Sequence, residues 1–268
     1  MFGYGILSFG LSFANLLIII VDLGMGTYTT RTIVRDGSVL NKFIGNLIPF
    51  KIFLSIILFI ISILLLILLG YDILSIKVAL VFIIQVIFLS MTNLINGVFQ
   101  AFEDLKAQSI GTIINSVVLL VSFFVVMALK LNIIFVAGTY ALGYFIFFIY
   151  LFIKFLQKFQ MPKLEFDFKF WKNTAIASVP FGLSVFFASL YFTIDIILIS
   201  YLAGDYSTGI YRSAYNVVTA FATFSGVYQI VIFPVMAKMF DKSEHLLKIS
   251  LEQSIKYLLL IVLPLVVF

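Results

Sequence analysis

Residues 47–69 read LIPFKIFLSIILFIISILLLILL, an apolar run in which Lys51 is the only charged residue. A helix rises about 1.5 Å per residue, so a run of this length crosses the roughly 30 Å hydrocarbon core of a bilayer. Strands of membrane barrels are about 9–11 residues long and alternate polar with apolar side chains. This run is longer and does not alternate, so it predicts a membrane-spanning helix.

The whole sequence has the same character. Of its 268 residues, 63% are hydrophobic and 11% are charged, and the mean hydropathy is +1.21. A soluble domain is about half apolar and about one quarter charged. A soluble fold of this length could not bury so much apolar surface, whereas lipid can surround it. The sequence contains no cysteine, which excludes disulfides and thiolate chemistry.

Seven further apolar runs are spaced along the chain, and together they predict an all-α integral membrane protein of about eight transmembrane helices. They are residues 2–30, 76–101, 109–129, 132–153, 174–203, 209–238 and 255–268. The last run ends at Phe268 before it is long enough to span, and the first begins beside Met1. We therefore expect the sequence to be an incomplete chain.

The basic residues predict how the helices are oriented. When alternate connections are compared, 14 of the 17 Lys and Arg residues fall on one side, and only Lys77, Lys130 and Arg212 fall on the other. Cytoplasmic loops carry the excess of Lys and Arg in membrane proteins. We expect the first helix to begin outside and the protein to be a multi-pass protein of the cytoplasmic membrane. The net charge of +5 then implies no nucleic-acid partner.

Several predicted helices carry polar side chains in a stripe along one face. On a wheel of about 100° per residue, each stripe covers an arc of roughly 80–100°. The stripes include Ser8, Ser12, Asn15 and Asp22 on the first helix, Gln85, Asn93, Asn96 and Gln100 on the third, and Tyr211, Tyr215 and Thr219 on the seventh. Such stripes either pack helices together or line a water-filled central cavity. Both interpretations are open at this stage.

Two carboxylates lie inside predicted spans, where ionisable groups are costly and are often functional. Asp22 is a candidate for taking up a proton or cation, for locking one conformation, or for pairing with Arg31, and it is equally consistent with a structural carboxylate held by hydroxyls. Asp195 lies nearer the outer end of its helix, where reaching toward the interface or pairing with Arg212 would account for it. Both are candidate coupling sites.

Four basic residues lie near predicted helix ends: Arg31, Arg35, Lys51 and Arg212. Basic residues at these positions commonly anchor a helix at the membrane interface. They are also candidates to bind a pyrophosphate, since arginine matches phosphate with two hydrogen bonds. The amides of Asn93, Asn96 and Gln100 are candidates to bind sugar hydroxyls.

The sequence carries no motif for nucleotide hydrolysis, metalloprotease, serine-hydrolase or dinucleotide chemistry. The single histidine, His245, lies in a polar segment and is more consistent with a solvated side chain than with catalysis. We therefore expect neither an enzyme nor a resident cofactor or metal. Energy for transport would come from a gradient, the membrane potential or the substrate.

Four stretches resemble one known family. Phe2-Gly3-Tyr4-Gly5 with Val21-Asp22-Leu23-Gly24-Met25-Gly26 is similar to the second helix of polysaccharide-biosynthesis flippases of the Wzx kind. Phe99-Gln100-Ala101-Phe102-Glu103 resembles the end of their fourth helix. Asp195 to Asp205 with Gly209 to Tyr215 resembles their seventh-to-eighth helix junction, and Phe233-Pro234-Val235-Met236 resembles the end of the eighth. Their superfamily also includes multidrug antiporters and lipid II flippases.

This resemblance implies a bundle of two lobes, each of six or more helices, related by pseudo-twofold symmetry. Residues 1–157 would form the first lobe without its first helix, residues 158–173 a cytoplasmic linker, and residues 174–268 the start of the second lobe. The implied function is to flip polyprenyl-(pyro)phosphate-linked oligosaccharides across the cytoplasmic membrane by alternating access. The implied partners are the bilayer, that lipid-linked glycan and glycan-assembly enzymes.

Two other functions compete with the flippase. An ion-coupled multidrug exporter of the same superfamily would use Asp22 for coupling, but the predicted spans contain few acidic residues. A membrane-embedded glycan polymerase usually needs a large outer loop that carries catalytic residues. The outer connections near 70–76, 130–132 and 203–209 are short, which argues against a polymerase.

Overall fold

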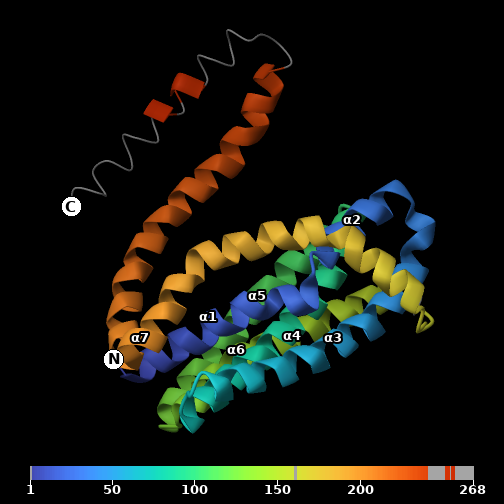
Figure 1. Cartoon of the computed structure of the whole chain (residues 1–268). Coiled ribbons are helices and arrows are strands. Elements are labelled where there is room, and N and C mark those ends of the chain that lie inside the picture. Colours follow the sequence, from blue (N-terminus) through green and yellow to red (C-terminus); the bar gives the residue numbers. More distant parts are fainter. Residues whose placement is uncertain (1, 160–161, 241–250, 254, 257–268) are drawn as a thin grey trace. The chain divides into compact units, whose positions relative to one another are not determined.

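The structure is a computed structural model that describes residues 2–159, 162–240, 251–253 and 255–256, with the backbone alone for 220–240. The chain divides into two compact units, Met1–Gly209 and Ile210–Phe268. Figure 1 shows the order of the helices along the chain. They are α1 (Phe2–Asp22), α2 (Met25–Arg35), a short 3-10 helix η1 (Gly37–Val39), α3 (Leu40–Leu68), α4 (Ile73–Ala101), α5 (Leu105–Ala128), α6 (Ile133–Lys158) and α7 (Phe168–Phe240).

The described part of the chain contains six helical segments that are long and apolar enough to cross a membrane. The first of them joins α1 and α2, and the last is the part of α7 up to Thr219. The prediction of an all-α membrane protein is therefore confirmed. The eighth predicted run, 255–268, lies almost entirely outside the described residues, so the count of about eight stays a prediction.

Helix α7 contains both the sixth and the seventh predicted runs. It continues through the region where a connection at 203–209 was expected, and only Gly204 departs from helical geometry, with φ 78° and ψ 174°. Glycine adopts such positive φ values without the steric cost that other residues meet. The two runs are therefore separated by a single residue, and the part of α7 beyond Gly209 belongs to the second unit.

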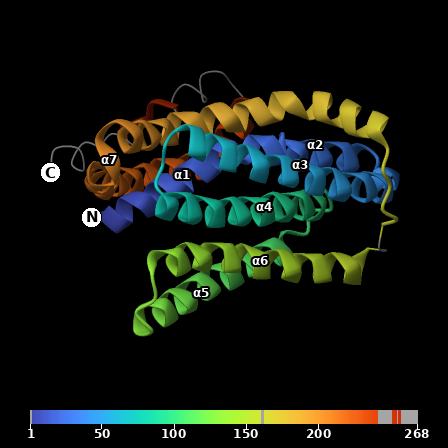
Figure 2. The same cartoon turned by 60° about the horizontal axis from the view of Figure 1, so that its bottom comes forward.

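Helix α4 is at the centre of the first unit. It packs against α1, α2, α3 and α6, and α6 in turn packs against α5 (Figure 2). One buried apolar cluster surrounds the first half of α4 with α1 and the end of α3, and a second surrounds its last half with α2, the start of α3 and α6. Helix α5 buries only Ala107, Gly111 and Val126, so most of its apolar surface is left for lipid.

Short capped connections join the helices on the side predicted to be outside. The Asp72 carboxylate accepts hydrogen bonds from the N–H groups of Leu74 and Ser75 at the start of α4, and Asn132 caps α6 by accepting from Ile134. Partial burial raises the pKa of Asp72, but the hydrogen bonds from Ser75 and Leu74 outweigh it and leave the pKa below its usual value. These caps satisfy helix-end donors that have no partner within the helix.

The segment between α6 and α7 is held against α3 by backbone chemistry. Pro49 has no N–H, so the carbonyl of Gly45 one turn earlier has no helical donor. The N–H of Glu165 donates to that carbonyl at 3.0 Å. A side chain at Gly45 would collide with the carbonyl of Lys163, so only glycine permits this close approach.

Asn46 completes the attachment. Its buried amide nitrogen donates to the Glu165 carboxylate at 2.8 Å, and its amide oxygen accepts from the N–H of Asp167 at 3.2 Å. Further along, Trp171 is buried and its ring stacks on Phe50 at a centroid distance of 5.1 Å. The segment between α6, which ends at Lys158, and α7, which begins at Phe168, is thus fastened to α3.

We predict that Asn46→Ala releases this segment. Losing the hydrogen bonds of a buried amide costs about 1–3 kcal/mol, which favours detachment of the segment that carries the exposed Lys163. Limited trypsin digestion in detergent, followed by mass spectrometry, should show faster cleavage after Lys163. Asn41→Ala, at an exposed position of the same helix, should leave the rate unchanged. Equal cleavage of the wild type and Asn46→Ala would contradict this account.

Candidate functional site

The first membrane-crossing helix is discontinuous. Leu23 and Gly24 separate α1 from α2, with φ values of 44° and 73°. A non-glycine residue with positive φ is uncommon and often marks a functional constraint. Asp22 is the last residue of α1, and Gly24 lies where the chain turns into α2. The break thus lies directly beside the carboxylate that the sequence singled out.

The first part of α7 packs closely over this break. A side chain at Gly24 would collide with the backbone of Gly182, and one at Gly182 would meet the carbonyl of Leu23. Further along, the Ser189 hydroxyl donates to the carbonyl of Asn15 at 3.2 Å. The first half of α7 therefore runs antiparallel to α1, and the Ser189 hydroxyl serves packing between the two helices.

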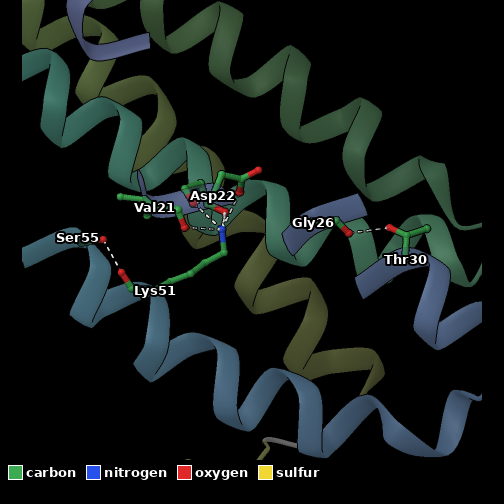
Figure 3. Close-up of polar contacts among 7 residues, drawn as sticks. Val21, Asp22, Gly26, Thr30, Lys51 and Ser55 are labelled. Carbon is green, nitrogen blue, oxygen red and sulfur yellow. Dashed lines mark hydrogen bonds and ion pairs between the residues drawn. The ribbon is translucent and has the colours of Figure 1, made fainter. Parts of the chain in front are cut away.

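A buried ion pair lies at the break (Figure 3). The Lys51 side chain reaches from α3 and is completely buried, and its Nζ lies 2.7 Å from Oδ1 of Asp22. Lys51 also donates to the hydroxyl of Ser90 on α4 at 2.5 Å and to the Ser90 carbonyl at 3.1 Å, and it lies 3.5 Å from the carbonyl of Val21. The Ser90 hydroxyl in turn donates to Asp22 at 3.2 Å.

These contacts join α1, α3 and α4 around one charge. Removing an ammonium and a carboxylate from water costs several kcal/mol for each ion, and only close pairing with further hydrogen bonds offsets that cost. The carboxyl end of α1 also favours a positive charge, because its last carbonyls lack helical donors and carry a partial negative charge. Asp22 therefore pairs with Lys51, and its carboxylate is 14% exposed.

Helices α2 and α4 are joined one turn beyond the break. The Thr30 hydroxyl hydrogen-bonds to the Gly97 carbonyl on α4 at 2.9 Å and to the Gly26 carbonyl at 3.1 Å. This contact places the basic end of α2, with the exposed Arg31 and Arg35, beside the amide-bearing end of α4. Two groups of predicted site residues are thus brought to one end of the first unit.

The three predicted amides on α4 differ in their surroundings. Asn93 is half-buried, and Asn96 is 8% exposed with an Oδ1 that has no hydrogen-bond partner among the described residues. Gln100 is exposed, and its amide donates to Gln108 on α5 at 3.1 Å. The end of α4 therefore offers amides ranging from buried to exposed along a single helix face. Their role in substrate binding stays a prediction.

The two remaining candidates lie on α7. Asp195 is half-buried, and its carboxylate accepts a hydrogen bond from the N–H of Ile196 at 2.9 Å. Arg212 belongs to the second unit, where its guanidinium lies 5.9 Å from the centre of the Tyr215 ring. The roles predicted for both residues stay predictions.

Sequence reasoning missed Ser90 and the helix break. At about 100° per residue, Ser90 lies roughly 60° outside the arc of the third polar stripe and so was not part of it. Gly24 comes two residues after Asp22 inside an apolar run, and a glycine at such a place is a signal for a break. Lys51 was expected near a helix end, whereas α3 begins eleven residues earlier, at Leu40. Its burial follows from that longer helix.

We predict strong coupling between Lys51 and Asp22. Lys51→Met leaves a carboxylate unpaired inside the membrane region and should lower the free energy of unfolding by about 3–5 kcal/mol. Adding Asp22→Asn should recover part of that loss, because no charge then remains unpaired. Thermal unfolding in detergent would measure both. The exposed pair Lys158–Asp104, also at 2.7 Å, provides the control, and its equivalent variants should change stability little. Purely additive losses at Lys51 and Asp22 would contradict the coupling.

Comparison with known proteins shows what this chain is similar to. No curated protein matches the chain. Among solved structures, the chain resembles an inward-facing multidrug resistance MATE family transporter of the MOP superfamily, with a TM-score of 0.70 and 17% identity over 100% of this chain and 68% of that one. At this identity the likeness shows the fold.

A family model described as "Polysaccharide biosynthesis protein" matches residues 2–240. The match includes the discontinuous first helix, the Lys51–Asp22 pair and all of α7. The family and the fold both agree with the expected membrane transporter rather than an enzyme, and they confirm the resemblance read from the sequence. The chain belongs to the polysaccharide biosynthesis protein family.

Proposed function

We propose that this chain forms part of a flippase that moves polyprenyl-(pyro)phosphate-linked oligosaccharides across the cytoplasmic membrane. The family match over residues 2–240 is the observation that carries the proposal. The physical problem is a charged, hydrated headgroup on a lipid tail, because taking that headgroup uncovered through hydrocarbon is prohibitive. A polar passage between two lobes carries the headgroup while the tail stays in lipid.

The end of the first unit where α2 and α4 meet suits such a headgroup. Arg31 and Arg35 are exposed on α2, and guanidinium groups bind phosphate oxygens with paired hydrogen bonds. Asn93, Asn96 and Gln100 follow on α4 and offer amides to sugar hydroxyls. In this proposal, phosphate meets α2 and sugar meets α4.

The same proposal assigns the residues of the chain to two lobes and a linker. Residues 1–157 form the first lobe, 158–173 the linker and 174–268 the start of a second lobe, in a bundle of two sets of six or more helices. The discontinuous α1–α2 helix supports alternating access, because transporters use broken helices at their substrate and ion sites. Glycan-assembly enzymes on the cytoplasmic side would deliver the completed lipid-linked product.

A multidrug exporter is the second candidate, favoured by the likeness to a MATE family transporter. In that case the binding site would take amphipathic cations, and Asp22 would couple to an ion. The Lys51 ammonium already satisfies the Asp22 carboxylate, which argues against this alternative. A glycan polymerase is less well supported still, because the described connections at 69–72 and 129–132 are too short for an outer catalytic domain.

Depletion of the full-length protein in its own host tests the proposal. We expect a complete lipid-linked oligosaccharide to accumulate on the cytoplasmic side, because assembly continues while export stops. Lipid extraction with mass spectrometry would detect and identify it, and protection from an externally added glycosidase would give its side. Unchanged glycans together with new sensitivity to cationic drugs would reject the flippase and favour the exporter.

Charge reversal tests the arginines. In a depleted strain, the Arg31→Glu and Arg35→Glu variants should fail to clear the accumulated lipid-linked oligosaccharide, because the carboxylate repels phosphate. Lys77→Glu, an exposed basic position predicted to lie outside, should clear it as the wild type does. Labelling of single introduced cysteines, in a chain that has none, checks that each variant inserts correctly. Full clearance by correctly inserted Arg31→Glu and Arg35→Glu would remove these residues from the binding site.

A further inference from the structure

The oxygen atoms around Lys51 form a shell of the kind that binds a metal cation. Four of them face Nζ: the Asp22 carboxylate at 2.7 Å, the Ser90 hydroxyl at 2.5 Å, the Ser90 carbonyl at 3.1 Å and the Val21 carbonyl at 3.5 Å. Two come from α1 at its break and two from α4. An ammonium has three donors and no acceptor, so a shell of oxygen acceptors suits it.

The same set of ligands suits an alkali-metal ion. Hard cations prefer carboxylate, hydroxyl and backbone carbonyl oxygens. In transporters, coupling ions bind where a membrane helix is interrupted, at the carboxyl end of the half-helix and at its unwound carbonyls. Asp22 and Val21 belong to such an end, directly before the positive-φ residues Leu23 and Gly24.

A solvent-exposed ion pair does not need this arrangement. Lys51 is 0% exposed, although a lysine in a membrane-spanning helix normally extends its ammonium toward the aqueous interface. Here the side chain instead points inward from α3 and reaches two other helices. Its ammonium takes the place where the carboxylate and the carbonyls converge, so it joins α1 to α4 as a bound ion would, and its own side chain ties both to α3.

We propose that Lys51 is a built-in replacement for an alkali-metal cation at the break between α1 and α2. The covalent ammonium holds the three helices together without an ion from solution. Asp22 is then occupied in this conformation and does not exchange a coupling ion. The inference that Asp22 exchanges no coupling ion rests on the proposed transport function. The inference of a cation site does not, and cation binding alone tests it.

Removing the ammonium should expose the site. Lys51→Ala leaves the Asp22 carboxylate, the Ser90 oxygens and the Val21 carbonyl without their cation. We would purify the wild type and this variant in detergent and measure melting temperature in choline chloride, NaCl and KCl at equal ionic strength. The variant should melt lower in choline and rise by about 3–6 °C in NaCl or KCl, as expected when a ligand binds only the folded state. The wild type should melt at one temperature in all three salts.

Three comparisons make the result specific. Lys51→Ala combined with Asp22→Asn should lose the response to alkali cations, since the carboxylate is gone. Lys42→Ala, at an exposed position of the same helix, should behave as the wild type. A Lys51→Ala variant that melts identically in the three salts, or that folds in none of them, overturns the proposal. So does a wild type that is stabilised by Na⁺ or K⁺ and loses that response with Asp22→Asn.

These readings do not depend on transport. If Lys51→Ala gains the cation response while depletion leaves lipid-linked glycans unchanged, the site stands and the flippase function fails. If depletion causes lipid-linked glycan to accumulate but no cation response is seen, the flippase stands and the role of Lys51 fails.

Discussion

The pairing of a buried ammonium with a carboxylate at the end of α1 constrains much of the first unit. An ion pair away from water is tolerated only when nearly every donor and acceptor finds a partner. That requirement fixes where α3 and α4 lie relative to α1, because Lys51 comes from one and Ser90 from the other. It also explains why α1 stops at Asp22, since a continuous helix would direct the Val21 carbonyl to its own chain.

The surrounding helices are compatible with this centre because small residues let their backbones approach. Gly24 and Gly182 allow α7 to cross the break, and the Thr30 hydroxyl bonds α2 to the Gly97 carbonyl of α4. In lipid no hydrophobic force draws helices together, so close packing and interhelical hydrogen bonds must do so. Polar and small residues near the break therefore serve packing.

The sequence was sufficient to predict an all-α membrane protein, the approximate position of each described span and the family. Those properties follow from the length of the apolar runs and from local motifs, both of which are read along the chain without knowledge of its packing. Lys51 is an example of what the sequence does not predict. A lysine in an apolar run indicates that burying its charge costs free energy, but it does not identify the group that pairs with the ammonium. Its partners lie 29 and 39 residues away, on helices whose rotations depend on packing. The attachment of Glu165 to the carbonyl freed by Pro49 was likewise invisible until both segments were placed.

That attachment changes how the chain between α6 and α7 behaves mechanically. A loop that is free of the body acts as a tether, and the elements that it joins can move independently. Residues 163–167 instead share hydrogen bonds with Gly45 and Asn46, and Trp171 is stacked on Phe50. The start of α7 is therefore fixed to α3 instead of being free to move independently of it. Gly204 is the one residue of α7 with non-helical geometry, so the later part of the helix is joined to this anchored start across an interruption.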